Sequence, residues 1–152
     1  MKTVNIALSA PDLSPEALAK AKVYMFLLRE AGSKREKIVG GVIAQRISKA
    51  MAIASPSEVE LSDKSTLTHV EGNLYCKPEL LPTPLGIPRL FVSSAHRQKG
   101  IAQSVLTAVA RTFIHGCPLD PKKGEVAFSQ PTSMGRAVME KWGEGGVRVY
   151  AE

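Results

Sequence analysis

Two apolar runs of strand length stand in the first third of the chain. They cover residues 23–28 and 38–44, and a charged connection at residues 32–37 separates them. Apolar runs of this length favour strands, and a short polar connection between them favours an antiparallel hairpin. The second strand is expected to continue through residues 51–54. Its Gly40-Gly41 pair indicates a bulge or a close approach of another backbone segment.

A helix start precedes this hairpin. Ser14, Pro15 and Glu16 form the pattern of a helix N-cap followed by proline at the first helical position. We therefore expect a short helix that runs through Ala21.

The second half of the chain alternates between strand and helix patterns. Residues 86–93 indicate a buried strand, and residues 101–113 indicate a helix with its apolar residues close to one face. These apolar residues are Ile101, Val105, Leu106, Val109 and Phe113. Residues 125–129 predict a further strand, 132–142 a last helix and 147–150 a final strand. The order of elements predicts an α/β (α+β) protein.

The segment at residues 55–84 shows neither the periodicity of a helix nor that of a strand. It is rich in Ser, Asp, Thr, Glu and Pro, and no apolar repeat is sustained across it. A segment of this length without regular structure is unusual inside a compact domain. We expect a mobile insertion within a single domain that covers residues 1–152, because neither flank carries enough apolar sequence to fold alone.

Composition narrows the class of protein. The chain has 152 residues, of which 44% are hydrophobic, and this suits one globular domain with a core. It has no apolar run near the roughly 20 residues that span a bilayer, and no signal-peptide pattern, so we expect an intracellular protein without a membrane partner. Cys76 and Cys117 form neither a disulfide framework nor a metal-binding pattern, so no metal site is expected. The formal charge of +6 suits an anionic partner, such as nucleic acid, an acidic protein surface or a phosphorylated cofactor.

The turn at residues 97–102 carries the clearest chemistry. Its sequence is Arg-Gln-Lys-Gly-Ile-Ala, and it joins a predicted strand to a predicted helix. Gly100 adopts backbone angles that other residues avoid, and Ala102 is small enough for a close approach. The free N–H groups in the first turn of the helix point at an anion. The pattern favours a pyrophosphate site with an acyl-CoA as the ligand, and the alternative is an ordinary glycine turn with two solvated cations.

This strand, turn and helix resemble the acetyl-CoA signature of the GNAT acetyltransferases. Three further blocks resemble the Eco/ESCO family of cohesin acetyltransferases. They are Gly-Ile-Pro-Arg-Leu-Phe-Val at 86–92, Phe-Ile-His-Gly at 113–116 and Val-Ala-Phe-Ser-Gln-Pro-Thr at 126–132. The resemblance is clear over residues 86–150 and looser over residues 22–54. It implies a GNAT fold, in which helices flank a mixed central sheet.

The resemblance also implies a function and a set of contacts. The function is transfer of acetyl from acetyl-CoA to lysines on the head of the cohesin SMC subunit, in the nucleus, to establish sister-chromatid cohesion. An association with chromatin or the replication machinery is implied as well. Family members usually carry an upstream zinc finger, and this sequence has no Cys2His2 pattern. The implied CoA contacts are Leu90, Phe91, Val92, Gln98, Lys99, Gly100, Ile101, Ala102, Gln103, Thr132, Ser133 and Met134.

The catalytic positions depart from the family. A serine and an aspartate are implicated in animal members, whereas Pro88 and Gln130 stand at the matching positions here, and neither side chain is a base. The acceptor lysine needs a base to remove its proton, because only about a thousandth of free lysine side chains are neutral near pH 7.4. Glu125 is the first candidate and His115 the second.

Other sources of the proton acceptor stay open. They include a backbone carbonyl, an ordered water chain and a carboxylate of the substrate. Cys117 is a less favoured nucleophile, since direct transfer needs none. Tyr150 either protonates the departing thiolate or packs in the core.

Four functional hypotheses follow. The first is a lysine N-acetyltransferase of the cohesin-modifying kind, and the second is a related enzyme that acts on another amine. The third is a CoA-binding module without catalysis, suggested by the missing serine and aspartate. The fourth is a basic chromatin-binding domain, suggested by the charge.

Overall fold

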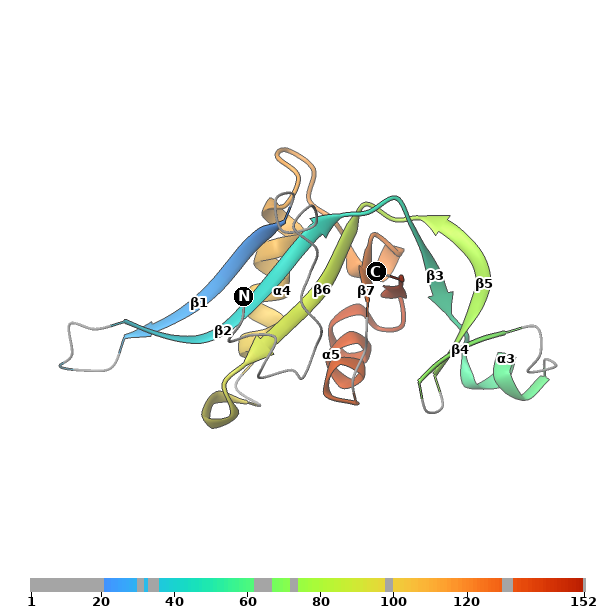
Figure 1. Ribbon diagram of the computed structural model, residues 1–152, viewed down its shortest axis with the longest axis horizontal. Helices are drawn as coiled ribbons and strands as arrows, with labels where there is room; N and C mark the ends of the chain where they lie inside the picture. The colour runs from blue at the N-terminus through green and yellow to red at the C-terminus, as the bar shows by residue number, and fades with distance from the viewer. Residues whose placement is uncertain are drawn as a thin grey trace. The chain divides into compact units, whose positions relative to one another are not determined.

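The computed structural model contains both strands and helices (Figure 1). It describes residues 21–29, 32, 36–61, 67–71, 74–97, 100–129 and 133–151. The helix expected before Ala21 lies outside these residues. No helix in the described part of the chain is both long and apolar enough to cross a membrane.

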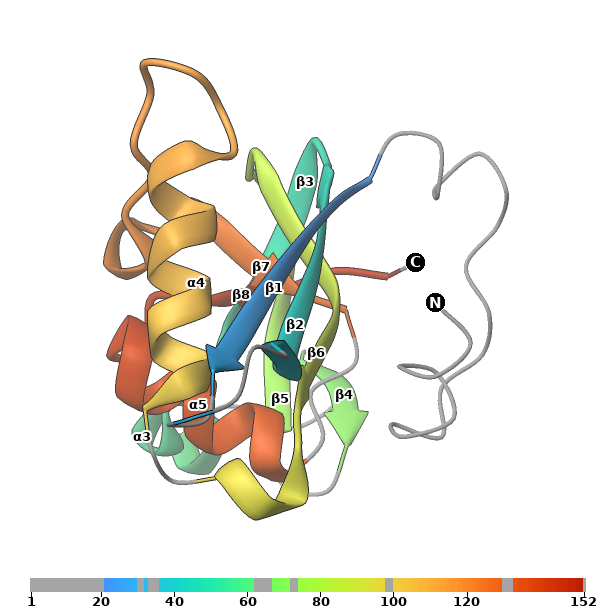
Figure 2. The same ribbon diagram turned by 90° about the vertical axis from the view of Figure 1, so that its left-hand side faces the viewer.

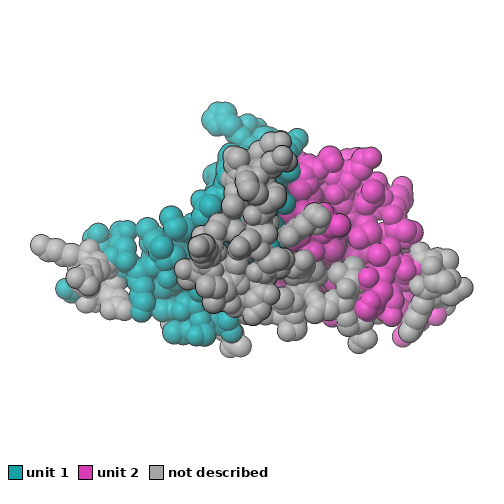
Figure 3. Space-filling model, viewed as in Figure 1, with its two compact units in different colours: residues 1–46, 87–118 teal, residues 47–86, 119–152 magenta. Residues whose placement is uncertain are grey.

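The chain divides into two compact units (Figure 3). Unit 1 contains residues 1–46 and 87–118, and unit 2 contains residues 47–86 and 119–152. Each unit therefore combines two separate stretches of sequence. The expected single domain and the mobility of residues 55–84 stay predictions.

Unit 1 holds the predicted hairpin. Strand β1 (Lys22–Arg29) pairs antiparallel with β2 (Glu36–Arg46), and β6 (Leu85–Val92) lies beside β2, with its first two residues in unit 2. Helix α4 (Ile101–Thr112) lies along one face of these strands (Figure 2). The hairpin, the strand at 86–93 and the helix at 101–113 are thus confirmed.

The predicted apolar face of α4 forms the core of unit 1. All five residues of that face are less than 10% exposed. Burial of each such side chain stabilises the fold by about 1.5–3 kcal/mol. At the other end of the helix, Nζ of Lys22 donates a hydrogen bond of 2.7 Å to the carbonyl of Phe113. A cation at this position also interacts favourably with the helix dipole.

Gly40 marks the close approach that its sequence predicted. A Cβ at this position would lie 3.0 Å from Cγ2 of Ile101 and 3.2 Å from the carbonyl oxygen of Phe91. The pairing of β1 with β2 also shifts register between Phe26 and Leu27, opposite this point. Gly40 therefore allows β2 to contact both α4 and β6.

The described residues of unit 2 form five strands and two α-helices, besides the first two residues of β6. The strands are β3 (Lys49–Ile53), β4 (Thr68–Glu71), β5 (Leu74–Pro82), β7 (Val126–Phe128) and β8 (Arg148–Val149), and the helices are α3 (Pro56–Leu61) and α5 (Ser133–Gly143). Strand β3 pairs antiparallel with β5 and β8, β4 pairs antiparallel with β5, and β7 pairs parallel with β8. The strand at 125–129, the helix at 132–142 and the strand at 147–150 are confirmed.

The expectation of an irregular segment at residues 55–84 is wrong, because α3, β4 and β5 lie there. Helix α3 starts with a capping box. The Ser55 N–H donates to Oε2 of Glu58 at 2.7 Å, and the Glu58 N–H donates to Oγ of Ser55 at 3.3 Å. Strand β5 contains Pro78 and Pro82, which normally argue against a strand. It forms because β3 and β4 pair with it on both sides.

The expected continuation of the second strand through residue 54 is also wrong. The strand stops at Arg46, and β3 begins as a separate strand at Lys49. The two residues between them bind a different segment: the Ile47 N–H donates to Pro84 O at 3.2 Å, and the Thr83 N–H donates to Ser48 O at 2.9 Å. These tertiary hydrogen bonds hold the break between β2 and β3, where four of the five residues at 45–49 are polar.

Candidate functional site

The predicted anion-binding turn lies at the start of α4 in unit 1. Gly100 is the N-cap of the helix, with φ 76° and ψ 10°. This left-handed conformation favours glycine. A Cβ built at Gly100 would meet no atom of the described residues within 4 Å, and the residue is exposed. No described residue therefore fills the space beside Gly100.

The first turn of α4 begins directly after Gly100. The Ser104 N–H donates to the carbonyl of Gly100 at 3.0 Å, and this bond is the first of the helical ladder. The N–H groups of Ile101, Ala102 and Gln103 precede it, and the first N–H groups of a helix have no partner within the helix. The helix has 12 residues, and its dipole places about half a positive charge at this end. These features together fit a phosphate group.

The segment that leads into the turn contains a histidine that the sequence analysis did not single out. The 3-10 helix η2 (Ser94–His96) follows β6, and the His96 N–H donates to the carbonyl of Ser93 at 2.9 Å. Nδ1 of His96 is buried and has no hydrogen-bond partner among the described residues. Arg97 follows with an extended backbone and is exposed. The one sequence signal for His96 is its place directly before Arg97.

The other predicted CoA contacts fall in three places. Leu90, Phe91 and Val92 are half-buried at the end of β6 in unit 1. Gln98, Lys99 and Thr132 lie outside the described residues. Ser133 and Met134 form the first positions of α5 in unit 2, where only their backbone is described. These contacts stay predictions.

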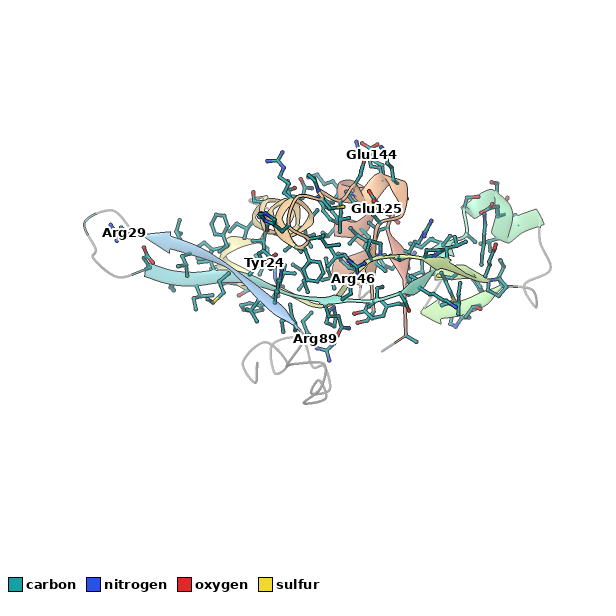
Figure 4. The ribbon with its side chains drawn as sticks, turned by 90° about the horizontal axis from the view of Figure 1, so that it is seen from above. Tyr24, Arg29, Arg46, Arg89, Glu125 and Glu144 are labelled. Carbon is teal, nitrogen blue, oxygen red and sulfur yellow. The ribbon has the colours of Figure 1, made fainter. Side chains whose placement is uncertain are left out.

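The two candidate bases lie in different units. Glu125 is half-buried in unit 2, and its Oε1 accepts a hydrogen bond of 2.8 Å from the Asp120 N–H (Figure 4). This bond holds the loop of η3 (Pro121–Lys123), where the Asp120 side chain accepts from the Lys122 N–H at 2.9 Å. His115 is exposed in unit 1, beyond the end of α4. The structure thus gives Glu125 a structural hydrogen bond, and both catalytic roles stay predictions.

The position of the family's serine carries no donor or base in this chain. Pro88 is buried in β6, and its carbonyl accepts a hydrogen bond of 2.7 Å from Nη1 of Arg89. Arg89 is only 2% exposed, and it lies on the face of the unit 1 strands opposite α4 (Figure 4). Gln130 lies outside the described residues.

The remaining reactive side chains differ in exposure. Cys76 is buried, and burial raises the pKa of its thiol to about 11, whereas Cys117 is exposed. Tyr150 is buried in unit 2 beside Ala50 and Ala127, with Ile47 packed against this cluster. Its ring also occupies the space that a Cβ at Gly86 would need. Packing therefore accounts for the Tyr150 ring.

Comparison with known proteins gives consistent matches. Residues 82–150 match the model of the ESCO1/2 acetyl-transferase family. The chain is 33% identical over 152 residues to the N-acetyltransferase ECO1 of Yarrowia lipolytica, which covers the whole chain and 46% of that protein. It is 32% identical over 141 residues to the N-acetyltransferase eso1 of Schizosaccharomyces pombe, which covers 91% of the chain and 15% of that protein. The chain thus spans less than half the length of these two curated relatives.

A solved structure extends the match to the fold. The acetyltransferase domain of xEco2, bound to a lysine–CoA conjugate, superposes with a TM-score of 0.76 at 27% sequence identity. The match covers 99% of this chain and 79% of that one. The GNAT-type fold, with helices beside a mixed sheet, is therefore confirmed. From its blocks of sequence, its relatives and its fold, the chain belongs to the Eco/ESCO family of acetyltransferases.

Proposed function

We propose that this chain is a lysine N-acetyltransferase that transfers acetyl from acetyl-CoA to lysines on the head of the cohesin SMC subunit. It would act in the nucleus, in association with chromatin or the replication machinery, to establish sister-chromatid cohesion. Membership of the Eco/ESCO family supports this proposal. So does the lysine–CoA conjugate that the related xEco2 domain binds.

One observation carries the proposal furthest. Gly100 holds a left-handed conformation at the N-terminus of α4, and no atom of the described residues lies within 4 Å of the place of its Cβ. A diphosphate needs this combination of unpaired N–H groups, a positive helix end and an unobstructed approach. The residues present thus fit CoA, which supplies a reactive acetyl thioester when it binds.

Two parts of the chain bind two different parts of CoA in this proposal. The N–H groups of residues 101–103 hold the diphosphate, and Arg97 adds charge attraction from the exposed side of the turn. The end of β6, at residues 90–92, offers main-chain groups to the amides of the pantetheine arm. Fixing the ligand at both points orients its reactive end, and orientation is itself a large contribution to rate.

Proton removal from the acceptor lysine requires a base. Glu125 would have to share its carboxylate with the Asp120 N–H while it accepts the proton. His115 is exposed, so a substrate or a closing segment would have to exclude water around it. We keep Glu125 as the first candidate because a half-buried carboxylate is held in one position, and a fixed base is more effective.

A CoA-binding module without catalysis is the second candidate function. Two observations favour it. Pro88 stands at the position of the family's serine with neither a hydroxyl nor an N–H group, and Glu125 has a structural partner. Such a module binds CoA and transfers nothing.

Calorimetric titration with acetyl-CoA, followed by mass spectrometry of a cohesin-head peptide, separates these functions. We expect binding and acetylation of lysine, and Glu125→Gln should then reduce the rate. Binding without transfer would identify the module, and faster acetylation of a small amine would identify an enzyme for another substrate. If acetyl-CoA does not bind, the basic chromatin-binding domain becomes the preferred hypothesis, and salt-sensitive DNA binding would test it.

A further inference from the structure

We propose that unit 2 binds a small apolar amino acid in a cavity lined by residues of α3, α5, β3 and β5. The cavity has a volume of about 590 Å³, which lies within the usual range for ligand pockets. Its described lining residues all belong to unit 2, and none of them is among the predicted CoA contacts. The proposal therefore does not depend on the CoA site.

The walls of the cavity are mainly apolar. Six apolar residues line it, and they come from both stretches of sequence that build unit 2: Ile53, Ala54, Val59, Leu74, Met139 and Val147. Four of the six are at most 7% exposed, so most of the wall is part of the packed core. Such walls favour an apolar side chain in the ligand, because its transfer out of water is favourable.

Three charged side chains also line the cavity. Arg136 lies on α5, Glu140 lies one turn later on the same helix, and Glu60 lies on α3. Among the described residues, none of these three side chains has a hydrogen bond or an ion pair. Arg136 is half-buried, whereas both glutamates are exposed. The cavity thus offers one unpaired cation and two unpaired carboxylates beside its apolar walls.

These charges complement the two charged groups of an amino acid. The guanidinium of Arg136 donates to a carboxylate, and the carboxylates of Glu60 and Glu140 accept from an ammonium group. A simple carboxylic acid would be repelled by the two glutamates, and a simple amine would leave a half-buried arginine without an acceptor. A zwitterion with an apolar side chain satisfies all three charges and the walls.

Calorimetric titration of the whole chain with L-phenylalanine tests the proposal. Two derivatives isolate the two charged groups, because N-acetylphenylalanine has no ammonium group and phenethylamine has no carboxylate. Three variants remove the proposed partners, namely Arg136→Gln, Glu60→Gln and Glu140→Gln. Lys141→Gln is the matched control, because it removes an exposed cation of α5 that is not among the described lining residues.

We expect the unchanged chain to bind phenylalanine more tightly than either derivative. Arg136→Gln should weaken phenylalanine about tenfold, as loss of one charge-assisted hydrogen bond does, and should leave phenethylamine unaffected. The two glutamate variants should weaken phenylalanine and phenethylamine, and they should bind N-acetylphenylalanine at least as tightly as the unchanged chain does. Lys141→Gln should stay within about twofold of the unchanged chain for all three compounds.

A cavity-filling variant tests where the compounds bind. Val59→Phe puts a larger side chain at a lining position of α3 and should abolish binding of all three compounds. The proposal is overturned if phenylalanine does not bind, if Val59→Phe binds it as well as the unchanged chain does, or if Arg136→Gln weakens all three compounds alike. Should a variant fail to fold in thermal unfolding, the unchanged chain still decides, because tighter binding of either derivative than of phenylalanine would also overturn the proposal.

Discussion

Replacing Gly100 by glutamate tests the location of the phosphate site. The residue has φ 76°, so any side chain at this position costs about 1–2 kcal/mol of backbone strain. A Cβ there would meet no atom within 4 Å in the part of the chain that the structure describes, so we expect no further penalty from packing. At 2–4 °C per kcal/mol for a chain of this size, we expect Tm to fall by about 2–8 °C. The variant should therefore fold.

The added carboxylate acts on the ligand rather than on the fold. At about 6 Å from a bound phosphate and an effective dielectric constant of about 20, repulsion between two unit charges is about 3 kcal/mol. That energy corresponds to a loss of affinity of about a hundredfold. Calorimetric titration with CoA measures it directly, and thermal unfolding of the same sample checks the fold.

Two control variants separate strain from charge. Gly100→Ala carries the strain alone, and Gly100→Gln carries the strain with a side chain of the same size but no charge. Both should lower Tm by as much as Gly100→Glu does. Both should also bind CoA much more tightly than Gly100→Glu does. Equal affinity of Gly100→Glu and Gly100→Gln for CoA would refute a phosphate site at the N-terminus of α4.

Three further predictions concern stability and reactivity. Of the two cysteines, Cys117 should react rapidly with a thiol reagent in the native chain, and Cys76 should react only after unfolding, because it is buried and its thiol pKa is about 11; peptide mapping after a timed reaction measures both rates. The pKa of Glu58 is lowered to about 2, chiefly by the hydrogen bond with Lys77, whose Nζ lies 2.8 Å from Oε1. Its contribution to stability should be complete above about pH 4.5 and disappear as the pH falls toward 2, so urea unfolding should find Glu58→Gln less stable than the unchanged chain at pH 6 and equal to it near pH 2; an equal difference at both pH values would contradict this. Arg148→Leu should cost about 2–3 kcal/mol in the same assay, because Nη1 of Arg148 donates to Pro82 O at 2.9 Å and to Oγ1 of the buried Thr83 at 3.1 Å; a loss below about 0.5 kcal/mol would refute this role.

Local signals in the sequence predicted most of the elements that the structure contains. The apolar face of α4 follows a helical period, and the hairpin runs are bounded by polar residues, so each element is encoded within its own sequence. The prediction of an irregular segment at residues 55–84 was wrong for a physical reason. Strand β5 carries two prolines and exposed side chains, and its pairing with β3 and β4 rather than its own pattern makes it a strand.

The same distinction divides the candidate site. The turn at Gly100 depends only on local sequence, because it consists of one glycine with a positive φ directly before a helix. The sequence predicted this turn. Catalysis requires side chains from distant segments to meet, and no spacing in the sequence encodes such a meeting. Glu125 illustrates the difficulty: a lone carboxylate before a strand fits a base, but the structure uses its Oε1 to hold the Asp120 N–H. A glycine turn at a helix end is thus readable from the sequence, while the roles of single titratable side chains depend on tertiary surroundings.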